Sequence, residues 1–293
     1  MRVCFFLAWL TILGAGAPSL AARPAPEVLK PSTPRNVNYA NDSCRLARAF
    51  GTGDALTILT LDSFGPGQSF KLILAGKRFG NVRQSADVRI RFGEEQEQKV
   101  PFLLGDLGKN NPALILRGSL RVDMPQETTT DFSQPSRPLL SDQRLAAIKE
   151  LLVGPPLRQH VRLSFGSLRA PFAALDKCIN ELLVRWGIDP VQHATLTRPV
   201  APKGSPANWV TNSDYPAAAQ MRGAQGLVEF RLSVDAMGKP TACHIQQSTR
   251  PPEFDKTVCN LMMRRARFDP ALDRNNQPVA SFFRSTFAFM IQQ

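Results

Sequence analysis

Residues 226–238 of this chain read Gly-Leu-Val-Glu-Phe-Arg-Leu-Ser-Val-Asp-Ala-Met-Gly. Apolar residues at even positions alternate with polar residues at odd positions: Val228, Phe230, Leu232 and Val234 against Glu229, Arg231, Ser233 and Asp235. A period of two predicts a β-strand with one buried face and one face in solvent. Residues 235–238 predict a tight turn after this strand, because Gly238 can adopt a positive φ.

The elements around this strand complete a small domain, which we expect to span residues 214–293. A short helix is expected at 217–222, capped by Asp214, and a second strand at 241–247. A second helix then carries its apolar residues on one stripe: Phe254, Val258, Leu261 and Met262. The last strand is expected at 281–291. These elements predict an α+β fold, in which two helices cover one face of a small antiparallel three-stranded sheet.

A small open sheet leaves backbone N–H and C=O groups unpaired along its edge strands. Such an edge either is blunted or binds an extended peptide as an additional strand. The C-terminal block therefore indicates a binding module.

The same block contains several spaced motifs. They are Tyr215-Pro216, Gly223 and Gly226, the alternating strand with Asp235 and Gly238, Phe254-Asp255, and Arg265-x-Arg267-Phe268-x-Pro270-Ala271. Together they resemble the C-terminal domain of TonB-family energy transducers, over residues 209–291. The resemblance implies a periplasmic domain that binds the TonB box, an extended peptide of TonB-dependent outer-membrane receptors, by strand addition. In the family, this contact couples inner-membrane energy to nutrient uptake.

The resemblance also implies where the receptor peptide binds. By position, the last strand offers the docking edge, and Tyr215 and Pro216 flank it. The partner-binding residues expected on that strand are Arg284, Thr286, Ala288 and Met290.

The N-terminal half departs from the family. Family members usually keep an uncleaved anchor that contacts a proton-driven inner-membrane motor complex, followed by a spacer of Glu-Pro and Lys-Pro repeats. This sequence has no such spacer before the C-terminal block, and its first apolar stretch contains no histidine. A soluble periplasmic module is our first interpretation, and a membrane-anchored energy transducer is the alternative.

Residues 1–21 have the three-part layout of a secretory signal peptide. Arg2 precedes an almost wholly apolar stretch at 3–13, and Ser19-Leu20-Ala21 places small residues before a cleavage site. The apolar stretch is shorter than the ~20 residues that span a bilayer. We therefore expect cleavage and export to the periplasm, with an uncleaved inner-membrane anchor as the alternative.

Export gives the cysteines a predicted role. Cys4 lies in the signal peptide, and the others are Cys44, Cys178, Cys243 and Cys259. An even number in an oxidising compartment predicts two disulfides, for which three pairings exist. A bridge between Cys44 and Cys178 would tie the last helix of the first domain to its first element. A bridge between Cys243 and Cys259 would join a strand of the C-terminal block to its second helix.

Three segments separate the signal peptide from the C-terminal block. Residues 22–40 are rich in proline and predict an extended leader. Residues 41–188 predict a strand-rich α+β domain of no recognised family, and residues 189–213 an irregular linker in which Trp209 packs on the next domain. Strands are expected at 55–61, 69–74, 88–92, 113–122 and 159–165, and helices at 141–153, capped by Ser141, and 169–186.

The chain is strongly basic, with 36 Lys and Arg residues against 24 Asp and Glu residues. The basic residues are scattered and lack the interleaved aromatic residues that stack bases, so we expect no nucleic-acid partner. A solvated surface is the simplest interpretation. For an exported protein, the other is an anionic envelope surface, either acidic lipid or lipopolysaccharide, bound by residues 41–188.

The residue types of catalysis form no recognisable site. A nucleophile pair of Cys178 and His160 needs a free thiol, which export disfavours. A zinc site at Cys243, His244 and Cys259 lacks the paired cysteine spacing of structural zinc sites. We therefore expect a protein that is not an enzyme and that holds no cofactor or metal.

Overall fold

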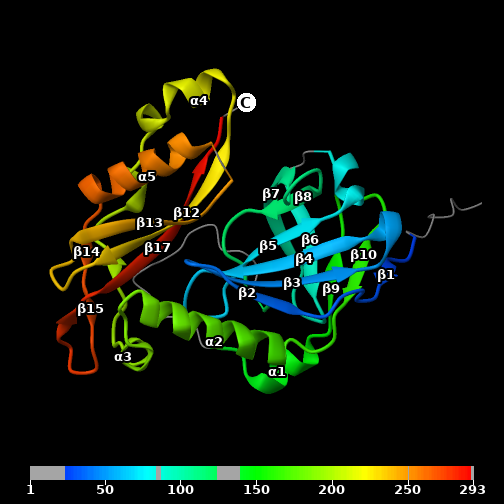
Figure 1. Cartoon of the computed structure of the whole chain (residues 1–293), viewed down its shortest axis with the longest axis horizontal. Helices are drawn as coiled ribbons and strands as arrows, with labels where there is room; N and C mark the ends of the chain where they lie inside the picture. Colours follow the sequence, from blue (N-terminus) through cyan, green and yellow to red (C-terminus); the bar gives the residue numbers. More distant parts are fainter. Residues whose placement is uncertain (1–23, 84–86, 124–138, 250, 292–293) are drawn as a thin grey trace, which may run out of the picture.

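The fold is that of a computed structural model, which describes residues 24–83, 87–123, 139–249 and 251–291 (Figure 1). The predicted signal peptide, residues 1–21, lies outside the described residues. Within the described ranges, no helix has the length and apolar character needed to cross a membrane. The buried apolar side chains form two main clusters, one within residues 29–186 and the other within residues 196–289. We call residues 24–188 the N-terminal part and residues 189–291 the C-terminal part.

The N-terminal part contains a ten-stranded sheet in the order β1-β10-β9-β6-β7-β8-β5-β4-β3-β2. The strands are β1 (Glu27–Leu29), β2 (Asn36–Tyr39), β3 (Cys44–Phe50), β4 (Thr57–Ser63), β5 (Lys71–Ala75), β6 (Asp87–Phe92), β7 (Gln98–Asp106), β8 (Pro112–Leu116), β9 (Glu150–Val153) and β10 (Val161–Ser164). Neighbouring strands are antiparallel except for β1 and β10, which are parallel. The five predicted strands correspond to β4, β5, β6, β8 and β10, whereas β3, β7 and β9 were not predicted.

The first described segment closes this sheet. β1 pairs with β10 at one end of the sheet, and β2 pairs with β3 at the other end. Pro31, between β1 and β2, forms a bridge with Phe50 of β3, so the single segment 27–39 connects the two ends. A closed sheet has no long unpaired edge. Within the leader that we expected at 22–40, residues 27–29 and 36–39 are therefore strands of this sheet. The prolines lie outside β1 and β2, where they shorten the strands without removing ladder hydrogen bonds.

Two helices pack against the sheet of the N-terminal part. Helix α2 (Arg169–Arg185) lies beside β2 and β3 (Figure 1), and the disulfide between Cys44 and Cys178 joins it to β3. Its buried residues are Pro171, Phe172, Leu175, Cys178, Ile179, Leu182 and Leu183. Helix α1 (Asp142–Ala147) begins at Ser141, whose hydroxyl accepts a hydrogen bond from the Arg144 N–H, as predicted.

The helix predicted at 141–153 is wrong beyond α1. Residues 150–153 form β9 instead, with Leu151 and Val153 buried and Glu150 and Leu152 half-buried. A helix and a strand would both place Leu151 and Val153 in the core. The segment forms a strand because it pairs with β6 on one side and β10 on the other.

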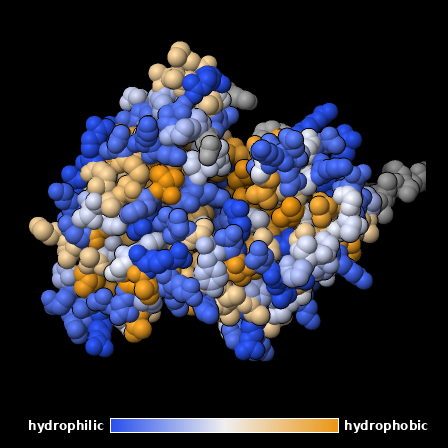
Figure 2. Space-filling view, in the orientation of Figure 1, coloured by the Kyte–Doolittle hydropathy of each residue, from blue (hydrophilic) through white to orange (hydrophobic). Residues whose placement is uncertain are grey.

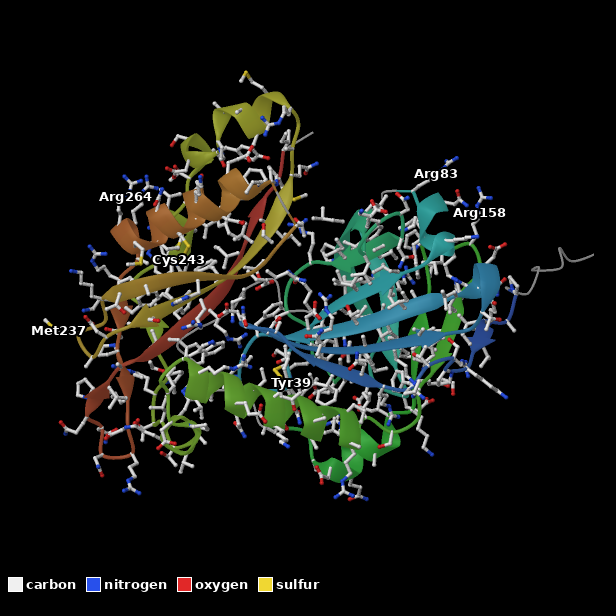
Figure 3. The ribbon with its side chains drawn as sticks, viewed as in Figure 1. Tyr39, Arg83, Arg158, Met237, Cys243 and Arg264 are labelled. Carbon is white, nitrogen blue, oxygen red and sulfur yellow. A yellow bond between two sulfur atoms is a disulfide. The ribbon has the colours of Figure 1, made fainter. Side chains whose placement is uncertain are left out.

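The C-terminal part contains a three-stranded antiparallel sheet. Strand β12 (Gly226–Val234) lies between β13 (Pro240–Ser248) and β17 (Ser281–Phe289). Helix α5 (Pro252–Arg265) covers one face with the predicted stripe, and the disulfide between Cys243 and Cys259 joins it to β13 (Figure 3). Helix α4 (Ala217–Met221) lies near the start of α5, where Arg222 pairs with Glu253.

The segment predicted as a linker, residues 189–213, is more ordered than expected. It contains α3 (Pro190–Ala194) and β11 (Ala201–Pro202), and β11 pairs with β14 (Phe268–Asp269). Trp209 packs on Phe268, with ring centroids 5.2 Å apart, as predicted. The remaining short elements are β15 (Ala271–Leu272), β16 (Pro278–Val279), and the 3₁₀ helices η1 (Gly53–Ala55), η2 (Lys77–Asn81), η3 (Pro206–Asn208) and η4 (Asn212–Asp214).

Candidate functional site

The predicted docking strand, β17, lies at one edge of the three-stranded sheet. It pairs with β12 in a ladder that runs from Gly226 opposite Phe289 to Val234 opposite Ser281. Among the described residues, no strand pairs with the other edge of β17. That edge therefore presents the backbone donors and acceptors that an added strand requires.

The side chains of Arg284 and Thr286 point toward the N-terminal part. Thr286 donates a hydrogen bond of 2.6 Å from Oγ1 to Glu229 Oε1, and Glu229 forms an ion pair of 2.7 Å with Lys71 of β5. Arg284 packs against Gly65 so closely that a Cβ there would come within 2.6 Å of the Arg284 Nε atom. Burial lowers the pKa of Arg284, and the Glu229 carboxylate opposes this shift. The Glu229 carboxylate therefore pairs with the buried Lys71 and also influences the half-buried Arg284.

Arg231 of β12 occupies a second buried site on the same face. Its guanidinium carbon lies 4.2 Å from the ring centroid of Trp186, and its Nη2 atom lies 3.6 Å from Asp42 Oδ1. Gln246 of β13 donates hydrogen bonds of 2.9 and 3.1 Å to the carbonyl oxygens of Asp42 and Phe64. Burial lowers the pKa of Arg231, whereas the Asp42 carboxylate raises it.

Aromatic rings extend this contact to the start of β17. The Phe282 ring stacks on His193 of α3, with centroids 5.1 Å apart, and meets Trp186 edge-on at 5.4 Å. Burial, and secondly the nearby Arg284 guanidinium, lower the pKa of His193. The surroundings of His193 therefore disfavour its protonated form, and the imidazole packs as an aromatic ring.

These contacts correct the prediction for the polar face of β12. We expected Glu229 and Arg231 in solvent, but only 9% and 3% of their surfaces are exposed. The reason is that the N-terminal part packs on this face and supplies Lys71, Asp42 and Trp186 as partners. This contact has no signal in the sequence, because a charged residue opposite a buried face fits solvent and a buried ion pair equally well.

Tyr215 lies beneath the end of β17. Its ring meets Phe254 and Phe289 edge-on, with centroids 5.6 and 5.4 Å apart, and its hydroxyl donates a hydrogen bond to the carbonyl of Ala224. Pro216 follows as the N-cap residue of α4. Tyr215 and Pro216 therefore fix the start of α4 against the aromatic core behind β17. The Tyr215 hydroxyl is engaged by the Ala224 carbonyl and is not directed at a ligand.

Asp214 has a different role from the predicted one. It does not cap α4, since its carboxylate accepts a hydrogen bond of 2.8 Å from the Thr211 N–H and forms an ion pair of 2.6 Å with Arg265. The Arg265 guanidinium, together with the Thr211 hydrogen bonds, holds the pKa of Asp214 well below its usual range. The pair joins η4 to the last turn of α5.

A cleft of about 1160 Å³ opens between the two parts beyond the end of β17. Residues after β17 contribute to one wall, including the predicted binding residue Met290, while Ala288 pairs with Leu227 inside the ladder. The other wall comes from β5, β7 and β8. Figure 2 shows apolar side chains in the hollow between the two parts. The cleft was not predicted, because its two walls are far apart in the sequence.

The residues considered for catalysis and zinc binding have structural roles. Cys178 is bonded to Cys44, so a nucleophile pair with His160 lacks its thiol. Cys243 and Cys259 are bonded to each other. Within the ranges that the structure describes, no group of three His, Cys, Asp or Glu side chains is placed to hold a metal ion.

Comparison with known proteins concerns the C-terminal part alone. No curated protein matches the chain. Residues 211–291 match the family model described as Gram-negative bacterial TonB protein C-terminal. The matched range contains β12, β13, α5 and β17, and thus the whole three-stranded sheet. The resemblance predicted from the motifs is therefore confirmed, and residues 211–291 are a TonB C-terminal domain.

Proposed function

We propose that this chain is a periplasmic protein-binding module that docks an extended peptide of a TonB-dependent outer-membrane receptor. The peptide adds as a fourth strand along the outer edge of β17, at residues 284–291. This role belongs to TonB-dependent transport across the outer membrane, which fits the family of residues 211–291. It requires binding but no catalysis.

The observation that carries the proposal is the position of β17. The apolar face of its sheet is covered by α5, and the polar face by the N-terminal part. Strand addition uses neither face, since it consumes backbone groups at the edge. A peptide can therefore bind along β17 without separating the two parts of the chain.

Two features support a periplasmic location. Disulfides such as Cys44–Cys178 and Cys243–Cys259 persist in oxidising compartments. The predicted signal peptide at 1–21 would direct export. An intact-mass measurement on the native protein separates the two forms of the proposal: loss of residues 1–21 gives a soluble module, and their retention gives an anchored transducer that can contact the inner-membrane motor complex.

The proposed binding edge is tested by NMR on the mature chain. The probe is a synthetic TonB-box peptide copied from a TonB-dependent receptor of the same organism. We expect the backbone amide signals of residues 284–291 to shift on addition of peptide. The matched control is β13, the opposite edge strand of the same sheet, whose amides should not respond. Absence of any shift, or shifts confined to β13, would contradict strand addition at β17.

A further inference from the structure

The cleft beyond β17 extends the peptide site onto the N-terminal part. We propose that it binds the continuation of the same receptor peptide and selects for apolar side chains at alternate positions. This inference rests on the proposed function, because β17 must hold the first segment of the peptide. It gives the N-terminal part a share in recognising the partner.

The wall from the N-terminal part contains an apolar row that crosses three neighbouring strands, with the charged residues Arg45, Asp106 and Lys109 elsewhere on the same wall. Leu103 of β7 lies directly opposite Ile115 of β8, which lies opposite Ile73 of β5. Ile73 belongs to a small apolar cluster that is separate from the main core of the N-terminal part, and Ile115 packs against that cluster. The row therefore lies outside the main core. Within it, Ile73 is buried, and the half-buried Leu103 and Ile115 are the members that a ligand can contact.

The facing wall is mainly polar. It contains the amide of Gln225 and the hydroxyls of Ser248 and Thr249, from the ends of the C-terminal sheet. Successive side chains of an extended peptide point to opposite sides. A peptide with alternating apolar and polar residues can thus place one set against the apolar row and the other set against the polar wall.

Size and position favour a peptide over a small molecule. The cleft, at about 1160 Å³, exceeds the ~300–1,000 Å³ of most small-molecule sites. Met290 and Ile291 follow directly after β17 and line the same cleft. A peptide paired along β17 is therefore led into the cleft at the end of the strand.

The test compares peptides of two lengths on the full mature chain. The short peptide is the TonB-box segment that covers β17. The long peptides extend it by about six residues, or ~20 Å. The extension carries either valine or serine at alternate positions, and each version is made once with the extension at the N-terminus and once at the C-terminus. We expect the valine peptide to bind about tenfold more tightly than the serine peptide in one of the two orientations, as measured by fluorescence anisotropy.

Two variants assign that gain to the cleft. Ile115→Ser should remove the tenfold advantage of valine and leave the affinity for the short peptide unchanged. Val28→Ser is the matched control, because Val28 is a 56% exposed aliphatic residue of the same sheet in β1, outside the cleft. If Ile115→Ser fails to fold, NMR on the unaltered chain gives the same answer: the amides of residues 103–107 should shift with the valine peptide and not with the short peptide.

The possible failures are distinguishable. If the short peptide binds but valine and serine extensions bind equally, the cleft takes no part, and this inference is overturned while the proposed function stands. If the short peptide does not bind, the proposed function itself fails, and the inference fails with it. Self-association of the free chain that Ile115→Ser abolishes would assign the cleft to a second copy, and would overturn the proposal as well.

Discussion

Glu229 carries a buried charge in the interface between the two parts. Its carboxylate interacts with Lys71 at 2.7 Å, accepts the Thr286 hydroxyl, and lies near Arg284. Only 11% of its side-chain surface and 3% of that of Lys71 are exposed. Loss of this carboxylate leaves the buried Lys71 ammonium group without its partner, which costs about 3–5 kcal/mol in comparable sites. We expect Glu229→Gln to lower the free energy of unfolding by about 3 kcal/mol in urea denaturation.

The matched control is an ion pair of similar length at the surface. Lys77 and Asp54 are 2.9 Å apart, but 79% and 88% of their side-chain surfaces are exposed. Water and salt weaken such a pair, and so Asp54→Asn should leave the unfolding curve unchanged. Equal effects of Glu229→Gln and Asp54→Asn would show that the interface is not held by the buried charge.

At the scale of elements, local patterns predicted strands and helices better than they predicted what covers them. The alternation in β12 identified the strand and its apolar face, because Phe230 and Leu232 can only be buried. It could not identify the partner of Arg231, since that partner, Trp186, belongs to another part of the chain. The strand β17 was therefore predictable, whereas the contacts of the Arg284 and Thr286 side chains were not.

The ion pair between Asp214 and Arg265 makes a pH-dependent link between η4 and α5. The folded chain holds the pKa of Asp214 below its usual range, so the unfolded chain binds a proton more readily as the pH falls. The stabilisation is complete above the unfolded pKa of about 3.9 and is lost at lower pH. Asp214→Asn should therefore be less stable than the unaltered chain at pH 7, and the difference should shrink below about pH 4. Thermal unfolding across this range measures it, and a difference that grows on acidification would contradict the assignment.

At the scale of the whole molecule, the fold of the C-terminal part could be predicted better because two of its strands pair with near neighbours in the sequence. The strands β12 and β13 are joined by the predicted turn, and their hairpin could be inferred from 226–247 alone. The N-terminal sheet depends on distant pairings, such as Glu27 of β1 opposite Val161 of β10. Short proline-flanked segments carry no sign of such partners, and the cleft between the two parts depends on the same long-range arrangement.

The two parts should stay together without a covalent connection. Neither disulfide links the two parts: Cys44–Cys178 lies within the N-terminal part and Cys243–Cys259 within the C-terminal part. The covalent connection between the parts is therefore the backbone near the exposed Gly187. We expect the fragments to co-elute in size-exclusion chromatography after cleavage at a protease site inserted after Gly187. They should do so even in about 0.5 M salt, because buried ion pairs are screened far less than exposed ones. The same cleaved chain carrying Glu229→Gln should separate, since the buried Lys71 then loses its carboxylate partner. Separate elution of the unaltered fragments would show instead that the two parts are held together by the covalent connection and not by their interface.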